Sequence, residues 1–243
     1  MEASRLGMFT ASRISELMAS GTGKTRLNYI FDIADELING SKDFETKAMQ
    51  HGTINQYDAF DIAFRPKLGG TWYDKFIKVN DKLGASPDIL GFDFVGDIKC
   101  PYSIHNFFEQ RDKLPKKYIY QSQVQMIAAK VDIGYMCLYL TKPEEFGIDW
   151  TEYPFTVDER TFIHEIKFSQ ELEDNILKAV EDNHPLIGQC VELLNTATEL
   201  TDIEFYRSQY DGIRYSLLKD TNWLNKESCI RFNNKYYTKI NNN

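Results

Sequence analysis

Two carboxylates and a lysine stand close together in one short stretch of this sequence. Asp88 follows a proline, and further along Asp97 and Lys99 enclose Ile98. Converging carboxylates suit a hard cation such as Mg²⁺ or Mn²⁺. Such a cation lowers the pKa of a bound water and stabilises charge on a phosphoryl group. A lysine beside it can stabilise the same charge or help to deprotonate the water. The residue types therefore predict metal-dependent phosphoryl chemistry, as in one large class of nucleases.

The elements that must position these side chains can be predicted from the local pattern. Residues 92–99 alternate apolar and polar and predict a strand, so Asp97 and Lys99 share one face and Ile98 points to the other. Gly91 marks a turn before it, and a hairpin there would return the carboxylate of Asp88 to the same face. The competing interpretation of such a short motif is an ordinary ion pair on a solvated strand.

The rest of the chain predicts a mixed α/β protein. A strand is expected over 133–140, with further strands between 76 and 99. A helix carrying Gln121 and Gln123 should begin near Pro115. Further helices are expected over 11–18, 27–38, 43–64 and 162–180, the last exposed and amphipathic. No firm pattern is visible after Thr196, although part of the tail over 231–243 could be strand.

Composition predicts a globular chain of one domain. The 243 residues are 42% hydrophobic and 26% charged, and no linker or internal repeat divides them. We expect no membrane helix, since no apolar run approaches about 20 residues. The four cysteines are widely spaced, which argues against a zinc or iron–sulfur site. Cys100 and Cys137 lie in apolar runs and are expected to be buried free thiols, as suits a reducing cytoplasm.

The net charge of -8 is unusual for a protein that binds DNA. Basic residues nevertheless gather around the motif-bearing segments, which favours a locally positive channel with salt-sensitive phosphate contacts. They are Lys24, Arg26, Arg65, Lys67, Arg111, Lys113, Lys116 and Lys117. Lys24 lies in a glycine-containing run that lacks the first glycine of a nucleotide-binding P-loop. We therefore predict that Lys24 contacts a DNA phosphate rather than ATP.

Five further segments stand in order from about residue 5 to 140. They are Arg5-Leu6-Gly7 with Thr10-Ala11-Ser12, Gly52 with Ala59, SPDIL, GDIKCP, and Tyr118 with Gln121, Gln123 and Met126. In type and order these segments resemble the lambda exonuclease (YqaJ-type viral recombinase) family of PD-(D/E)xK nucleases. The resemblance implies a restriction-endonuclease-like core, in which helices flank a central mixed sheet. We expect one nuclease domain over 1–243, with the motif-bearing core at 5–140 and a region of unknown role at 196–243.

The resemblance also implies roles for individual residues. Asp88 and Asp97 would bind the metal together with the Ile98 backbone carbonyl, while Lys99 and Gln121 would complete the catalytic set. A second group would bind DNA, with the guanidinium of Arg5 gripping a 5′-terminal phosphate. Its other members are Ser12, Tyr118 and Gln123. For Tyr118 the competing interpretation is simple core packing.

One position departs from the family pattern. Gln56 stands where the family's G-x-x-x-E-x-x-A helix carries a glutamate. An amide can still coordinate a cation through its carbonyl oxygen, but it adds no charge. Gln56 is therefore a further candidate ligand, and the sequence leaves open one metal or two.

The resulting hypothesis is a Mg²⁺- or Mn²⁺-dependent 5′-to-3′ exonuclease that degrades one strand of double-stranded DNA from its end to 5′-mononucleotides. The resemblance implies phage-type homologous recombination in the cytoplasm of a bacterial host, a single-strand annealing partner, and a homotrimer. Two alternatives remain open: a restriction-type DNA endonuclease, and a catalytically weak DNA-end-binding protein.

Overall fold

The computed structural model describes residues 5–20, 24–40, 46–141, 155–200, 229–232 and 235–239. Within the chain, two compact units can be distinguished. Unit 1 comprises Met1–Arg5, Thr10–Ser15 and Asp43–Asn175, and unit 2 comprises Leu6–Phe9, Glu16–Lys42 and Ile176–Asn243. The expectation of one domain over 1–243 stays a prediction.

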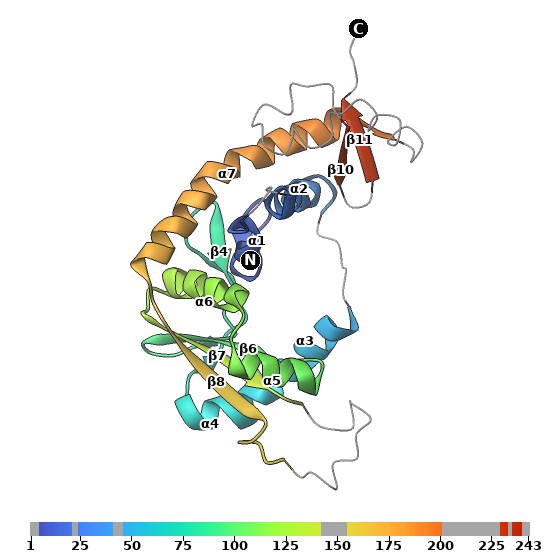
Figure 1. Ribbon diagram of the computed structural model, residues 1–243. Helices are drawn as coiled ribbons and strands as arrows, with labels where there is room; N and C mark the ends of the chain where they lie inside the picture. Colours follow the sequence, from blue (N-terminus) through green and yellow to red (C-terminus); the bar gives the residue numbers. More distant parts are fainter. Residues whose placement is uncertain are drawn as a thin grey trace. The chain divides into compact units, whose positions relative to one another are not determined.

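A five-stranded mixed sheet organises unit 1 (Figure 1). Its strand order is β2 (Thr71–Trp72), β5 (Ile89–Leu90), β6 (Phe94–Lys99), β7 (Ile133–Tyr139) and β8 (Thr161–Lys167). Strands β6 and β7 are parallel, whereas the other neighbours are antiparallel. A parallel pair needs a crossover, and here α5 (Ile104–Asp112) and α6 (Lys116–Ala129) lie in it. The predicted mixed α/β fold is confirmed.

Helices pack on both faces of this sheet (Figure 1). One apolar cluster joins Ile98 to residues of α3 (Lys47–Ala59) and of the π-helical turn η2 (Phe60–Phe64). After η2 the chain continues into α4 (Arg65–Leu68), so the helix predicted over 43–64 is largely confirmed. The cluster on the other face joins Val95 to residues of α5 and α6. Strand β6 is therefore buried on both sides, which fixes the direction in which each of its side chains points.

A second, smaller sheet has three strands. Its order is β1 (Phe9–Thr10), β4 (Leu83–Ala85) and β3 (Ile77–Lys78). The short helix η1 (Ala11–Arg13) packs against α6 and β4, and α1 (Ile14–Leu17) follows it. The strands expected between 76 and 99 are confirmed, as is the helix expected near 11–18.

The helix predicted over 162–180 is wrong in its first part. Residues Thr161–Lys167 form β8, which pairs with β7 along its whole length, and helix α7 occupies Gln170–Thr196. Ile163 packs on one apolar cluster and Ile166 belongs to the other, as the two-residue period of a strand requires. The same apolar residues also fit a helical period, but β7 needs a partner for its backbone hydrogen bonds.

Unit 2 contains α2 (Lys24–Asn39), much of α7, and a small antiparallel sheet. The order of this sheet is β10 (Cys229–Phe232), β11 (Lys235–Lys239) and β9 (Ala197–Leu200), which confirms the expected strand content of the tail. The ring of Phe9 contacts the rings of Tyr29 and His184, with centroids 5.5 Å and 6.3 Å apart.

Two expectations from composition can be compared with the described residues. Cys100, Cys137 and Cys190 are buried free thiols, as expected for the first two, while the side chain of Cys229 lies outside the described part. Among the described helices, none is long and apolar enough to cross a membrane.

Candidate functional site

Strand β6 presents Asp97 and Lys99 on one face, as the alternating pattern predicts. The Nζ of Lys99 lies 2.6 Å from Oδ2 of Asp97, and Ile98 between them is fully buried in the opposite cluster. Asp97 is only 2% exposed, whereas the side chain of Lys99 is 24% exposed. A nearly buried carboxylate paired with a lysine that reaches solvent is not the solvated surface ion pair of the competing interpretation.

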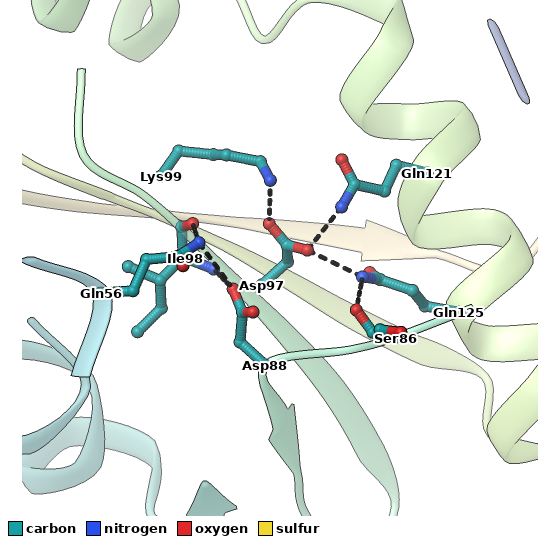
Figure 2. A network of polar contacts seen from close by, with 8 residues as sticks. All are labelled: Gln56, Ser86, Asp88, Asp97, Ile98, Lys99, Gln121 and Gln125. Atoms are coloured by element: carbon teal, nitrogen blue, oxygen red, sulfur yellow. Dashed lines mark hydrogen bonds and ion pairs between the residues drawn. The ribbon is translucent and has the colours of Figure 1, made fainter. Parts of the chain in front are cut away.

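The hairpin β5–β6 brings Asp88 to the same place (Figure 2). The backbone N–H of Asp88 donates to the carbonyl of Gly96 at 3.1 Å, which aligns Asp88 beside β6. Its carboxylate Oδ2 then accepts the backbone N–H of Ile98 at 2.7 Å. Asp88, Asp97 and Lys99 therefore converge, although Asp88 precedes the turn and the other two follow it.

Two glutamines of α6 donate hydrogen bonds to the same carboxylate oxygen of Asp97. Nε2 of Gln121 lies 2.5 Å from Oδ1 of Asp97, and Nε2 of Gln125 lies 2.7 Å from the same oxygen. Residues four apart on a helix share a face, which is why both amides reach one atom. Gln121 was expected at the site. Sequence reasoning missed Gln125, although its helical spacing from Gln121 carried the signal.

Gln56 of α3 approaches from the other side of β6. Its Nε2 donates to the backbone carbonyl of Ile98 at 2.9 Å and to Oδ2 of Asp88 at 3.4 Å. The amide therefore bridges two oxygens that were expected to bind metal. Rotation of the amide would instead present its carbonyl oxygen to the same space.

The remaining expected residues of α6 differ in position. The ring of Tyr118 lies below two ammonium groups, with Nζ of Lys99 at 5.5 Å and Nζ of Lys117 at 4.9 Å from its centroid. Tyr118 thus borders the site. Gln123 is fully buried, donates to the carbonyl of Ser169 at 3.1 Å and accepts the backbone N–H of Ser169 at 3.3 Å. Both ends of its amide are used within the fold, so nothing in the described structure supports the expected contact of Gln123 with DNA.

The three other expected DNA contacts lie near the N-terminus. Arg5 is exposed and precedes a turn. Ser12 is exposed in η1, which packs on α6, and its Oγ lies 3.4 Å from Oγ1 of Thr10. Lys24 is the first residue of α2, and its side chain lies outside the described part of the chain. Their roles stay predictions.

Burial and charge shift the acid–base behaviour of this site. Burial, reinforced by the charge of Asp97, raises the pKa of Asp88 from 3.8 to about 8, while Lys99 and the Ile98 N–H act in the opposite direction. Burial acts to lower the pKa of Lys99, but the charges of Asp97 and Asp88 and the hydrogen bond to Asp97 raise it above its ordinary value. The single positive charge of Lys99 cannot balance two ionised carboxylates. The site therefore favours the binding of a proton or a cation.

The residues present fit a hard divalent cation. Oδ2 of Asp97 is buried, and its partner among the described residues is the ammonium group of Lys99, 2.6 Å away, so this oxygen already faces a positive charge. Asp88, the Ile98 carbonyl and Gln56 supply further oxygens beside it. In the described part of the chain, no three His, Cys, Asp or Glu side chains are arranged so that they could hold a metal ion. A metal held here would therefore depend on backbone and amide oxygens as well as on the two carboxylates.

Solved structures with the same fold are nucleases by name. An alkaline exonuclease (LHK-Exo) from Laribacter hongkongensis is 24% identical, with a TM-score of 0.63 over 79% of this chain and 93% of that one. The same enzyme in complex with dAMP gives 25% identity and a TM-score of 0.64, over 78% and 92% of the two chains. A phage-related exonuclease from Haemophilus somnus 129PT is 19% identical, with a TM-score of 0.63 over 76% and 95%. These likenesses establish a fold of the PD-(D/E)xK type.

Comparison with curated sequences and with family models gives two further results. No curated protein matches this sequence. The model of the YqaJ-like viral recombinase domain matches residues 2–132, a stretch that includes Asp88, Asp97, Lys99, Gln121 and Gln125. Since this match spans more than half of the 243 residues, the chain belongs to the family of YqaJ-like viral recombinase domains.

Proposed function

We propose that this protein is a phage-type exonuclease that hydrolyses double-stranded DNA from its ends with a divalent metal. The convergence of Asp88, Asp97 and Lys99 on one face of the β5–β6 hairpin carries the proposal. Membership in the viral recombinase family supports it, as do the solved structures named alkaline exonuclease and phage-related exonuclease.

Each residue of the site has a proposed role. Asp88, Oδ2 of Asp97 and the Ile98 carbonyl would hold Mg²⁺ or Mn²⁺, with Gln56 as a further ligand through its amide oxygen. The bound metal would acidify the attacking water and stabilise charge on the phosphoryl group. Lys99 is kept protonated by its two carboxylate neighbours, so we assign it to charge stabilisation rather than to proton abstraction.

Gln121 has a second proposed role beside its hydrogen bond to Asp97. Its hydrogen bond to Asp97 supports a second role, in which Gln121 holds a water or a phosphate oxygen. Tyr118, next to Lys99, would pack against the bound strand.

The finer proposal is hydrolysis in the 5′-to-3′ direction with release of 5′-mononucleotides. It depends on Arg5, whose planar guanidinium can hold two oxygens of a terminal 5′ phosphate. Ser12 and Lys24 would add contacts to the same end of the DNA. Anchoring the 5′ phosphate would place the first phosphodiester bond at the metal.

The proposed setting is recombination by single-strand annealing. The partners are double-stranded DNA ends and a single-strand annealing protein, and the assembly is a homotrimer in the cytoplasm of a phage-infected bacterium. Sedimentation equilibrium of the purified protein tests the assembly, because a trimer and a monomer of 28.3 kDa differ threefold in mass.

A digestion time course on linear duplex DNA, labelled separately at the 5′ and 3′ ends, tests the activity. The reactions contain Mg²⁺, Mn²⁺ or EDTA, and a covalently closed circle is digested in parallel. Asp97→Asn is the site variant, and Asp93→Asn is its matched control because Asp93 is exposed in the turn of the same hairpin. The proposal predicts metal-dependent release of the 5′ label as mononucleotide, an intact circle, and loss of activity only in Asp97→Asn.

Two other outcomes would identify the alternatives. Linearisation of the closed circle would indicate a restriction-type endonuclease. Binding to DNA ends without loss of substrate under any metal would indicate an end-binding protein. The second alternative has an observation in its favour, since the neutral amide of Gln56 lies across two of the oxygens proposed to bind metal.

Anchoring by Arg5 has its own test. Arg5→Ala should reduce digestion of 5′-phosphorylated ends and leave digestion of 5′-hydroxyl ends nearly unchanged. An equal reduction on both substrates would remove the assignment of Arg5 and, with it, the argument for polarity.

A further inference from the structure

The two oxygens of Asp97 lie in different surroundings (Figure 2). Oδ1 accepts two short hydrogen bonds, from Gln121 at 2.5 Å and from Gln125 at 2.7 Å. Oδ2 instead faces the ammonium group of Lys99 at 2.6 Å and accepts no amide N–H among the described residues. A carboxylate whose Oδ1 is held by two donors cannot rotate freely, so it offers a single oxygen to the site.

Gln125 is buried too deeply to contact the substrate directly. It is 1% exposed, so neither DNA nor bulk water reaches its amide. Its Nε2 also lies 3.5 Å from the backbone carbonyl of Ser86, just ahead of Asp88 in the chain. This amide therefore lies between the segment that carries Asp88 and the strand that carries Asp97.

We propose that Gln125 is a positioning residue, which orients Asp97 so that Oδ2 is directed to the divalent cation. This inference rests on the proposed function, because it assumes that Asp97 binds metal. The partners of a metal-binding carboxylate are hydrogen-bonded in turn, and loss of such a partner typically weakens metal binding or activity by about 10–100-fold.

The same helix offers a matched control. Gln123 is a second buried glutamine of α6, but its amide is paired with the backbone of Ser169 and makes no contact with Asp97. Substitution of either glutamine by methionine removes an amide of similar size from the interior. Only Gln125→Met removes a donor from Asp97.

The experiment measures Mn²⁺ affinity of the metal-stripped protein by electron paramagnetic resonance, together with thermal stability and DNA digestion. Both variants should lose thermal stability. Gln125→Met should bind Mn²⁺ about 10–100-fold more weakly than wild type, with a matching loss in kcat, whereas Gln123→Met should stay within about twofold. If Gln125→Met fails to fold, Gln125→Asn takes its place, because its side chain is one methylene shorter and the donor no longer reaches Asp97. Its control is then Gln123→Asn.

The outcomes separate this inference from the proposed function. If wild type binds Mn²⁺ and digests DNA while the Gln125 and Gln123 variants bind Mn²⁺ equally, the positioning role is wrong and the proposed function stands. If wild type neither binds Mn²⁺ nor digests DNA, the proposed function fails and the role of Gln125 fails with it.

Discussion

The side-chain amide of Gln56 donates to the backbone carbonyl of Ile98 at 2.9 Å, across the space between α3 and β6. The same nitrogen lies 3.4 Å from the carboxylate of Asp88. Gln56 thus presents an N–H group from the sequence position at which the family pattern has a glutamate. In the metal-free protein this amide gives partial positive charge to two oxygens proposed to bind metal, so it competes with the cation for them.

Replacing this amide by a carboxylate should strengthen metal binding. Gln56→Glu adds a charged oxygen ligand beside Asp88, so we expect the Mn²⁺ dissociation constant to fall by about tenfold. The same change should destabilise the metal-free protein by about 1 kcal/mol or more, because three carboxylates would then repel one another in a partly buried place. A Mn²⁺ titration and thermal melts with and without metal measure both effects.

Gln50→Glu is the control for this prediction, since Gln50 is an exposed residue of the same helix and the charge change is identical. Equal Mn²⁺ affinities for the two variants would show that Gln56 does not face the metal.

Most of the candidate site could be predicted from the sequence because it depends on local geometry. The two-residue period of β6 sets the directions of Asp97, Ile98 and Lys99, and a tight turn at Gly91 returns Asp88 beside them. These relationships need only a strand and a hairpin.

Other features depend on tertiary contacts that one sequence does not contain. Gln123 and Gln125 both lie in α6, yet Gln123 donates a hydrogen bond to the Ser169 carbonyl and Gln125 donates one to the Asp97 carboxylate. Which glutamine faces the sheet depends on the rotation of α6 about its axis, which is set by packing on β7. The same holds for β8. Its apolar spacing fits both a helix and a strand, and pairing with β7 decides for the strand.

Lys99 should matter for activity and for folding. Lys99→Met removes the counter-charge of a carboxylate that is 2% exposed, which should cost about 3 kcal/mol of folding stability in the metal-free protein. With metal bound the carboxylate regains a cation, so most of that loss should disappear, while DNA hydrolysis falls by about 10³-fold. Urea denaturation with and without Mn²⁺, and digestion rates, give these quantities.

Lys117 provides the matched comparison for Lys99. Its ammonium lies over the same Tyr118 ring, 4.9 Å from the centroid. Lys117→Met should change the hydrolysis rate by no more than a few-fold. A similar fall in both variants would argue that general positive charge near the DNA, rather than the place of Lys99, supports activity.

The pKa of Asp88 predicts how the stability of the metal-free protein depends on pH. This pKa is raised to about 8 by burial and by Asp97, against about 3.9 in an unfolded chain. The folded state therefore holds a proton that the unfolded state releases between these values. The stabilisation is fully present below about pH 4 and is lost as the pH rises to about 8.

Asp88→Asn, which keeps a neutral acceptor for the Ile98 N–H, should flatten this dependence. Thermal melts of the metal-free proteins between pH 5 and 8 should show wild type losing more stability than Asp88→Asn as the pH rises. Asp93→Asn, in the exposed turn of the same hairpin, should follow wild type. Parallel slopes for all three proteins would mean that Asp88 is already ionised in the fold.

The close approach of α6 to β7 gives the last prediction. A Cβ on Gly134 would overlap Oγ of Ser122 but lie 3.5 Å from its Cβ, and this buried hydroxyl has no hydrogen-bond partner within the described part of the chain. Gly134→Ala should therefore push α6 away from the sheet and cost about 1–3 kcal/mol. Because Gln121 and Gln125 lie on the same helix, Mn²⁺ affinity should fall as well.

Ser122→Ala should be neutral or slightly stabilising by itself, since it removes an unpaired buried hydroxyl. Combined with Gly134→Ala it should recover most of the lost stability and metal affinity, because methyl groups 3.5 Å apart are in ordinary contact. Urea denaturation and Mn²⁺ titration of the two single variants and the double variant measure this coupling. Strictly additive effects would mean that the helix accommodates the new methyl group without moving, and that Ser122 does not set its distance from β7.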